Sequence, residues 1–156
     1  MITCFFEKGT EAHLRHVVVD ILVLKEDKIL LVKRTKTLME GGKWGLVGGY
    51  VERDENLQEA AEREIFEETG YKIKDIILLT IRHNPDRLHE DRQNISFVFF
   101  CTALEKEGKP DWESDERRWF SFDELPPEEK LAFDHPLNIE LYLKYKRENF
   151  PLPVFK

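Results

Sequence analysis

Apolar residues gather in short runs along the chain, and most of these runs have the length of a β-strand. Residues 16–24 (HVVVDILVL) are β-branched and almost continuously apolar, a pattern typical of a strand buried on both faces. The apolar pattern returns after a polar turn at residues 28–34, so the two segments predict a β-hairpin. A turn and a loop are expected at residues 105–116. Further strands are predicted in four places, at residues 44–51, 71–83, 94–104 and 117–121.

Two other segments show helical signals instead. Asn56 is a good N-cap, and Glu59 follows three residues later as in a capping box. Gly70 stands where a left-handed residue commonly ends a helix. These signals predict a helix over residues 56–69. Residues 135–147 carry four apolar residues at helical spacing, which predicts an amphipathic C-terminal helix that covers the sheet.

Strands between two covering helices predict an α/β protein, an α/β/α sandwich with a mixed β-sheet. The length of 156 residues fits one domain that is large enough for a real core. The chain has no internal repeat, no low-complexity segment and no linker long enough to separate domains. We therefore expect a single domain over residues 1–156, with its core at about 14–147.

The helix at residues 56–69 has an unusual distribution of charge. At about 100° per residue, Glu64 and Glu68 fall on the same stripe as the apolar Leu57 and Ala61, and Glu67 stands just beside them. Like charges four residues apart repel, and a carboxylate that faces the core loses hydration. A solvated acidic face is the alternative, but it does not explain the shared apolar stripe. A divalent metal ion between the carboxylates is the simplest explanation.

The segment from Gly49 to Tyr71 resembles a known motif. It has the form G-x5-E-x7-R-E-U-x-E-E-x-G-U, where U is a bulky apolar residue, and this is similar to the Nudix box. Its matching positions are Gly49, Glu55, Arg63, Glu64, Ile65, Glu67, Glu68 and Gly70. Tyr71 replaces the usual aliphatic residue, and Val47 stands where proline is common. The resemblance covers about residues 14–147 and implies the Nudix-type α/β/α sandwich with a mixed sheet.

The resemblance also implies an activity, the hydrolysis of a diphosphate linked to another group, with Mg²⁺ or Mn²⁺ as cofactor. These ions take hard oxygen ligands, bridge phosphate oxygens and lower the pKa of a bound water. The substrate would be a small-molecule nucleotide. The metal ligands that the resemblance implies are the side chains of Glu64, Glu68 and Glu67 and the backbone carbonyl of Gly48.

Roles for the neighbouring residues follow from the same resemblance. Arg63 orients the glutamates and, with Glu67, belongs to the catalytic group. Glu55 supports them through Arg63 or a water, and Gly49 belongs to the loop beside the metal. The family often takes its base or an extra metal ligand from a later acidic loop, and this chain offers three candidates there: Glu113, Asp115 and Glu116. We favour Glu116, although such a loop can also be merely solvated.

A second segment bears on the substrate. Residues 82–87 (RHNPDR), with Pro85 at their centre, are similar to the marker of the ADP-ribose pyrophosphatase branch, although Asn84 and the insertion at 88–91 depart from it. Pro85 as an ordinary loop residue is equally open. ADP-ribose or a related sugar nucleotide is the leading substrate class. Candidate phosphate clamps, chosen because guanidinium groups suit phosphate oxygens, are Arg34 and either Arg82 or Arg92.

Two other functions stay open. One is a house-cleaning enzyme that acts on (deoxy)nucleoside triphosphates and releases pyrophosphate. The other is a non-catalytic module that senses a nucleotide; such modules tend to lose the carboxylates of the box, and this chain keeps all of them.

Composition excludes some partners. The chain has 31 acidic and 24 basic residues and a net charge of −7, so neither nucleic acid nor an anionic membrane is expected as a partner. Its apolar runs are strand-sized, its N-terminus does not resemble a signal peptide, and Cys4 and Cys101 lack zinc-type spacing, so a cytoplasmic location is expected. The five histidines show no metal spacing either. Apolar residues at Phe5, Phe6 and 150–155 suggest a homodimer contact.

Overall fold

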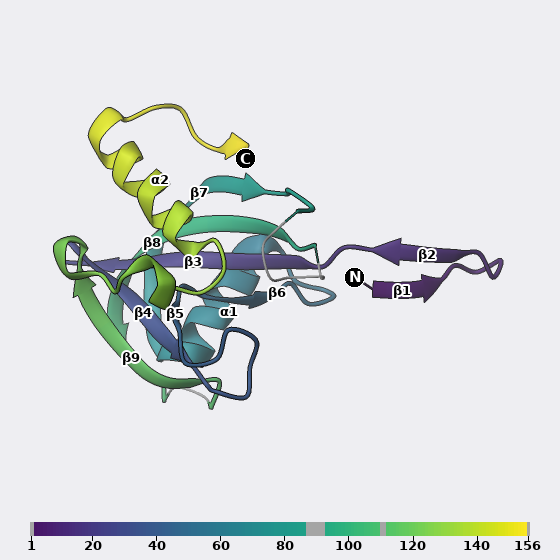
Figure 1. Ribbon diagram of the computed structural model, residues 1–156, viewed down its shortest axis with the longest axis horizontal. Coiled ribbons are helices and arrows are strands. Elements are labelled where there is room, and N and C mark those ends of the chain that lie inside the picture. Colours follow the sequence, from purple (N-terminus) through teal and green to yellow (C-terminus); the bar gives the residue numbers. More distant parts are fainter. Residues whose placement is uncertain (1, 87–92, 110–111, 156) are drawn as a thin grey trace.

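The structure is a computed structural model that describes residues 2–86, 93–109 and 112–155. Its strands are β1 (Ile2–Phe5), β2 (Glu11–Leu14), β3 (Val17–Lys25), β4 (Lys28–Arg34), β5 (Trp44–Gly45), β6 (Val47–Tyr50), β7 (Tyr71–Arg82), β8 (Ile95–Lys106), β9 (Ser114–Ser121) and β10 (Val154–Phe155). Its helices are α1 (Leu57–Thr69), α2 (His135–Glu148) and the short 3-10 turns η1 (Phe122–Glu124) and η2 (Glu128–Lys130). Figure 1 shows these elements along the chain.

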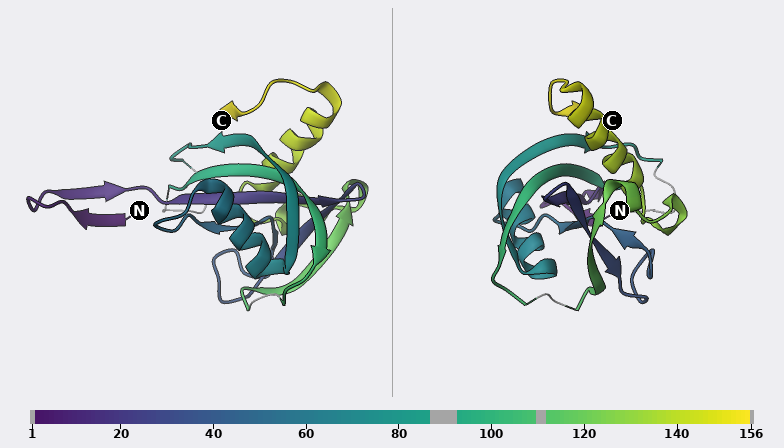
Figure 2. Two further views of the ribbon diagram at one scale, coloured as in Figure 1. Left: turned by 180° about the vertical axis from the view of Figure 1, so that it is seen from behind. Right: turned by 90° about the vertical axis from the view of Figure 1, so that its left-hand side faces the viewer.

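The main sheet is mixed, as the sequence predicts. Its strand order is β10-β7-β8-β3-β4-β5, with β6 paired to β3 and β9 paired to β4. The pairs β3–β8 and β7–β10 are parallel, and the other pairs in this sheet are antiparallel. Helices α1 and α2 lie on opposite sides of the sheet (Figure 2), which confirms the α/β/α sandwich.

Strand β3 supplies both cores because alternate residues point to opposite faces of a strand. Val19 and Ile21 pack in the cluster that includes Ile65 of α1, whereas Leu22 packs in the cluster that includes Ile139 of α2. Residues 18–23 of β3 are all buried, which confirms the prediction of a strand covered on both faces.

The segment at residues 105–116 differs from its prediction as a loop. Strand β8 continues to Lys106, and β9 already begins at Ser114. The polar residues at the start of β9 pair with β4, so their backbone groups gain partners from a strand distant in sequence. Local polarity could not predict this extension. The strand expected at 44–51 is also divided, into β5 and β6, with Leu46 between them.

Two elements near the termini were not predicted. Strands β1 and β2 form a separate hairpin that projects from the sandwich (Figure 1), with Phe5 and Phe6 exposed. Strand β10 pairs with β7, where Val154 lies opposite Thr80.

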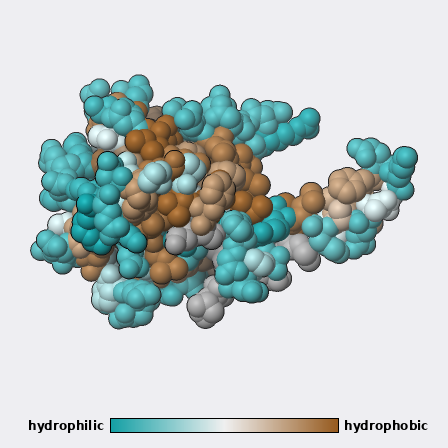
Figure 3. Space-filling model, turned by 90° about the horizontal axis from the view of Figure 1, so that it is seen from above, coloured by the Kyte–Doolittle hydropathy of each residue, from teal (hydrophilic) through white to brown (hydrophobic). Residues whose placement is uncertain are grey.

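Hydrophobic side chains gather on the face of the molecule shown in Figure 3. Within the described ranges, no helix is long and apolar enough to cross a membrane.

Candidate functional site

Helix α1, which carries the predicted carboxylates, begins and ends as its sequence predicts. Asn56 Oδ1 accepts hydrogen bonds from the N–H groups of Gln58 (2.9 Å) and Glu59 (3.0 Å). Glu59 Oε2 accepts in turn from the N–H of Asn56 at 2.8 Å, which completes a capping box. Gly70 follows the helix with a φ of 75°, and its N–H donates to the carbonyl of Phe66. These ends determine which side chains of α1 meet the sheet.

The acidic side chains of α1 lie where the helical spacing places them. Glu64 and Glu68 are 9% and 5% exposed, next to the fully buried Ala61 and Ile65. The side chain of Glu67 stands at the edge and is half exposed. Burial raises the pKa of Glu64 above its ordinary value, and the nearby guanidinium of Arg63 opposes this rise. The stripe of carboxylates on the core side of the helix is therefore confirmed.

Arg63 holds the carboxylates in place. Its Nη2 lies 2.7 Å from Glu55 Oε1, and its Nη1 lies 2.8 Å from Glu64 Oε1 and 3.1 Å from Glu67 Oε2. The guanidinium also donates to the backbone carbonyl of Tyr50 at 3.0 Å. The hydrogen bond from Arg63 lowers the pKa of Glu55, and the carboxylates raise the pKa of Arg63 in return. A fork with several donors allows one residue to orient three acids.

Two glycines of β6 allow the carboxylates to approach the sheet. The N–H of Gly48 donates to Glu68 Oε1 at 2.8 Å. A Cβ on Gly49 would lie 2.3 Å from Glu64 Oε1, and a Cβ on Gly48 would lie 2.1 Å from the carbonyl oxygen of Val19. A side chain at Gly48 would clash with backbone, so only glycine fits there, and a side chain at Gly49 would displace the carboxylate of Glu64.

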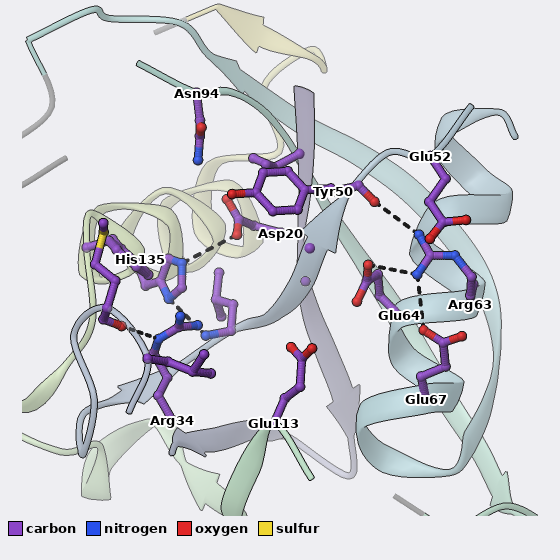
Figure 4. A pocket seen from close by; sticks show the side chains of 17 residues that line it. Asp20, Arg34, Tyr50, Glu52, Arg63, Glu64, Glu67, Asn94, Glu113 and His135 are labelled. Atoms are coloured by element: carbon purple, nitrogen blue, oxygen red, sulfur yellow. Dashed lines mark hydrogen bonds and ion pairs between the residues drawn. The ribbon is translucent and has the colours of Figure 1, made fainter. Parts of the chain in front are cut away.

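A cavity of about 450 Å³ opens beside these residues (Figure 4). The predicted site residues that line it are Arg34, Gly48, Gly49, Arg63, Glu64 and Glu67. Glu68 and Glu55 do not line the cavity, and each contacts a residue that does. The structure thus brings the predicted residues of the box together around one space.

Arg34 lies across the cavity from α1 (Figure 4). Its Nε donates to the carbonyl of Met39 at 2.8 Å, and its guanidinium lies 5.0 Å from the centre of the Phe133 ring. Arg34 therefore contributes positive charge to the wall that faces the carboxylates, and its role as a phosphate clamp stays a prediction.

Two other predicted substrate residues, Arg82 and Pro85, are not in this wall. Arg82 donates from Nε to Asn138 Oδ1 and lies 3.9 Å from Asp134, so it contacts the start of α2 instead of the cavity. Pro85 is exposed in a bend and does not line the cavity. Arg92 lies outside the described residues. The position of the Arg82 side chain depends on how β7 packs against α2. The sequence around Arg82 carries no signal for that packing.

Among the acids of the later loop, the structure favours a different residue from the one we expected. Glu116 lies in β9 opposite Lys33, its Oε2 is 3.9 Å from Lys33 Nζ, and it does not line the cavity. Glu113 lies just before β9 and lines the cavity. The reason is the unpredicted extension of β9, which places Glu116 within a strand pair and leaves Glu113 at its open end.

Comparison with known proteins places this arrangement in a family. A family model described as the NUDIX domain matches residues 14–141. The chain belongs to the NUDIX hydrolase family. Its box is the segment that forms α1 and the preceding glycines.

Individual family members are similar over most of their length. An ADP-ribose pyrophosphatase of Methanocaldococcus jannaschii is 40% identical over 131 residues, which make up 83% of this chain and 74% of that protein. An oxidized purine nucleoside triphosphate hydrolase of Danio rerio is 34% identical over 139 residues, 81% of this chain and 79% of that protein. A crystal structure of a NUDIX hydrolase from Nitrosomonas europaea matches with a TM-score of 0.78 at 26% identity, over 97% of this chain and 84% of that one.

NUDIX hydrolases generally use divalent metal ions, and the charges in the cavity fit such an ion. Among the described residues, two arginines line it, against five acidic residues: Asp20, Glu52, Glu64, Glu67 and Glu113. Glu67 and Glu113 raise the pKa of Glu64 through their like charge. A diphosphate would add further negative charge to this space, so a cation is needed between the two. Oxygen donors alone favour Mg²⁺ or Mn²⁺.

The carboxylates have other partners in the structure. Glu64 Oε1 accepts from Arg63, and the two oxygens of Glu68 accept from the N–H of Gly48 and from Ser114 Oγ. In the part of the chain that the structure describes, no three carboxylate, imidazole or thiol groups converge as a metal site. Each carboxylate oxygen has two lone pairs, so a hydrogen bond to one of them leaves the other able to bind a dication.

Asp20 and His135 are among the residues of the cavity wall that were not expected to belong to a site. Asp20 carried a signal in the sequence, because it is an aspartate within the apolar run 16–24. His135 carried none, because its role depends on contacts with residues far away in the chain. His135 Nδ1 accepts from the N–H of Leu46 at 2.9 Å, and its Nε2 lies 3.4 Å from Asp20 Oδ1.

Proposed function

We propose that this protein hydrolyses the diphosphate of a nucleoside diphosphate linked to a second group, with ADP-ribose or a related sugar nucleotide as substrate. The observation that carries the proposal is the row of carboxylates on α1, two of them bound by Arg63, at one end of a cavity with Arg34 opposite. Similarity to an ADP-ribose pyrophosphatase along most of that protein supports the substrate class.

Glu64, Glu67, Glu68 and the carbonyl of Gly48 are the groups that would hold Mg²⁺ or Mn²⁺. When bound, the ion neutralises phosphate charge and favours the ionisation of water. Arg63 keeps Glu64 and Glu67 turned toward the same space as the substrate.

The remaining steps involve the chain's own side chains. Arg34 contacts the diphosphate from the opposite wall, where its fork suits two phosphate oxygens. Glu113, which lines the cavity beside them, accepts the proton of the attacking water. The water oxygen bonds to one phosphorus, the bridging P–O bond breaks, and the bridging oxygen leaves with the other phosphate. Two phosphorylated products result.

A panel of nucleotides with Mg²⁺ tests this function. We expect ADP-ribose to yield AMP and ribose 5-phosphate, separated by chromatography, and expect no product without a divalent ion. If ADP-ribose and other sugar nucleotides all remain intact while another nucleotide is hydrolysed, the proposed substrate class is wrong.

A nucleoside triphosphate is the second candidate substrate. The Danio rerio relative, named for hydrolysis of oxidized purine nucleoside triphosphates, matches over most of both chains. The same panel separates the candidates, because a triphosphate would yield a nucleoside monophosphate and pyrophosphate. A nucleotide sensor would yield neither set of products.

A homodimer and a cytoplasmic location stay predictions. The exposed Phe5 and Phe6 of the projecting hairpin support a dimer, since a two-stranded hairpin alone is marginally stable in water. Light scattering after gel filtration would test it, and a monomer at all concentrations would contradict it.

A further inference from the structure

The end of the cavity next to α2 contains a buried pair, Asp20 and His135, that the proposed function does not use. We propose that Asp20, oriented by His135, accepts a hydrogen bond from the nucleoside part of the substrate and so selects that nucleoside. This proposal rests on the proposed function only in so far as the substrate is a nucleotide. It does not depend on whether that nucleotide is a sugar nucleotide or a nucleoside triphosphate.

Burial of the Asp20 carboxylate costs free energy, because the charged group loses its contact with water. Asp20 lies in the central strand β3, is 8% exposed, and is on the face that α2 covers, as is Leu22 two residues later. A buried carboxylate needs donors, and the side chains of Ser96 and His135 are among those that supply them. Ser96 Oγ donates to Asp20 Oδ2, and His135 Nε2 lies 3.4 Å from Asp20 Oδ1. The carboxylate is thereby held in one orientation at the cavity wall.

The contacts of His135 define its role as a positioning residue. Its Nδ1 accepts from the N–H of Leu46, so this nitrogen carries no proton. The ring proton is therefore on Nε2, which faces Asp20. Both nitrogens are engaged and the side chain is only 3% exposed, so His135 acts on a ligand through Asp20.

The charged groups that face this pair come from several elements. Arg34 of β4 and Glu113 before β9 line the same cavity, and the ring of Phe133 lies 5.5 Å from that of His135. The guanidinium of Arg34 lies 5.0 Å from the centre of the same Phe133 ring. In Figure 4, Arg34 and His135 lie on the side of the cavity away from the carboxylates of α1.

Chemistry at the two ends of the cavity differs accordingly. The α1 end is suited to a metal and a diphosphate. The apolar side chains of Val18, Leu46 and Phe133 line the same cavity as Asp20, and an apolar lining with a few placed polar groups is typical of small-molecule sites. A carboxylate accepts hydrogen bonds and repels phosphate, so this end favours the uncharged nucleoside. Suitable donors are the amino group of adenine and the hydroxyls of ribose.

Binding of nucleoside monophosphates tests the proposal without any hydrolysis. Calorimetry with AMP, IMP and 2′-deoxy- and 3′-deoxy-AMP in Mg²⁺ compares ligands that lack the amino group or one hydroxyl. We expect one of these losses to weaken binding to the wild-type protein by about tenfold, as when a buried acceptor loses its donor. Weaker binding of IMP would identify the adenine amino group as the donor, and weaker binding of one deoxy-AMP would identify the ribose hydroxyl that it lacks. In Asp20→Asn the same preference should shrink to within about twofold.

Two variants of His135 separate positioning from general stability. Gln can keep a donor near the position of Nε2, and Asn can keep an acceptor near that of Nδ1. We expect His135→Gln to retain the nucleoside preference and His135→Asn to lose it, even where both lower the melting temperature. If His135 serves only to accept the hydrogen bond from Leu46, His135→Asn should retain the nucleoside preference and His135→Gln should lose it. That result would show the proposal to be wrong.

Further outcomes would also overturn the proposal. These are an unchanged preference in a folded Asp20→Asn, or equal binding of all four ligands by the wild-type protein. Failure of the proposed function alone is distinguishable, since a protein that does not hydrolyse ADP-ribose can still show this preference in binding. If Asp20→Asn does not fold, the two His135 variants decide.

Discussion

Arg63 and Glu64 are neighbours in the chain, and their side chains meet in space, with Arg63 Nη1 2.8 Å from Glu64 Oε1. Adjacent residues of a helix normally point about 100° apart, so the contact requires the long arginine to turn along the helix surface. It does so because Glu55, before the helix, holds the guanidinium from the other side. Burial disfavours the charged form of Glu64, and the contact keeps this carboxylate beside the permanent positive charge of Arg63.

Replacing Arg63 by lysine tests this arrangement. Lysine keeps the charge but cannot contact Glu55, Glu64, Glu67 and the Tyr50 carbonyl at once. We expect kcat to fall by about 10- to 100-fold, as for other residues that orient metal ligands, with the fold retained by circular dichroism. Arg53→Lys is the matched control, because Arg53 is almost fully exposed, and its kcat should not change.

Glu68→Gln tests the row of carboxylates itself. The amide oxygen can still accept from the N–H of Gly48, so the loop should keep its structure. The loss of charge removes a ligand for the dication, and we expect turnover to disappear while the melting temperature stays within a few degrees. Glu62→Gln, on the exposed side of the same helix, should remain active. Normal turnover by Glu68→Gln would contradict the assignment of the active site.

The part of this site that local sequence predicts is the part built on one helix. A cap at Asn56, a stop at Gly70 and fixed helical spacing between them determine where Glu64 and Glu68 point. Nothing distant is needed to place them, so the prediction and the structure agree.

Residues positioned by contacts between distant segments could not be placed in this way. Glu116 pairs with Lys33 because β9 extends along β4, and Arg82 turns to α2 because the end of β7 lies beside that helix. His135 meets Asp20 only after α2 packs on β3. Each of these depends on the register of strands or on helix packing, for which short segments carry no signal.

Glu113 and Glu116 form a natural pair for testing the base. Only Glu113 lines the cavity, whereas Glu116 is paired with Lys33. We expect Glu113→Gln to lower kcat by about 10²-fold or more, in the range typical of a general base, with little change in KM. Glu116→Gln should leave kcat within about twofold of the wild-type value. A larger loss in Glu116→Gln than in Glu113→Gln, measured under steady-state conditions, would return the role to Glu116.

Glu55 gives the site a predictable dependence on pH. Its pKa is lowered from 4.5, chiefly by the hydrogen bond from Arg63, so the folded state binds its proton less readily than the unfolded chain does. The ion pair therefore stabilises the fold above pH 4.5, and this contribution is lost as pH falls through the lowered pKa.

The consequence can be measured with Glu55→Gln. At pH 7 we expect this variant to be less stable than the wild type by about 1 kcal/mol, a modest figure because solvent screens the pair. The difference should shrink as pH falls below 4.5, because the wild-type carboxyl becomes neutral as well. Urea unfolding at pH 7 and at pH 3 compares the two proteins. A gap that stays constant or widens at acid pH would show that packing of the side chain, and not its charge, supports Arg63.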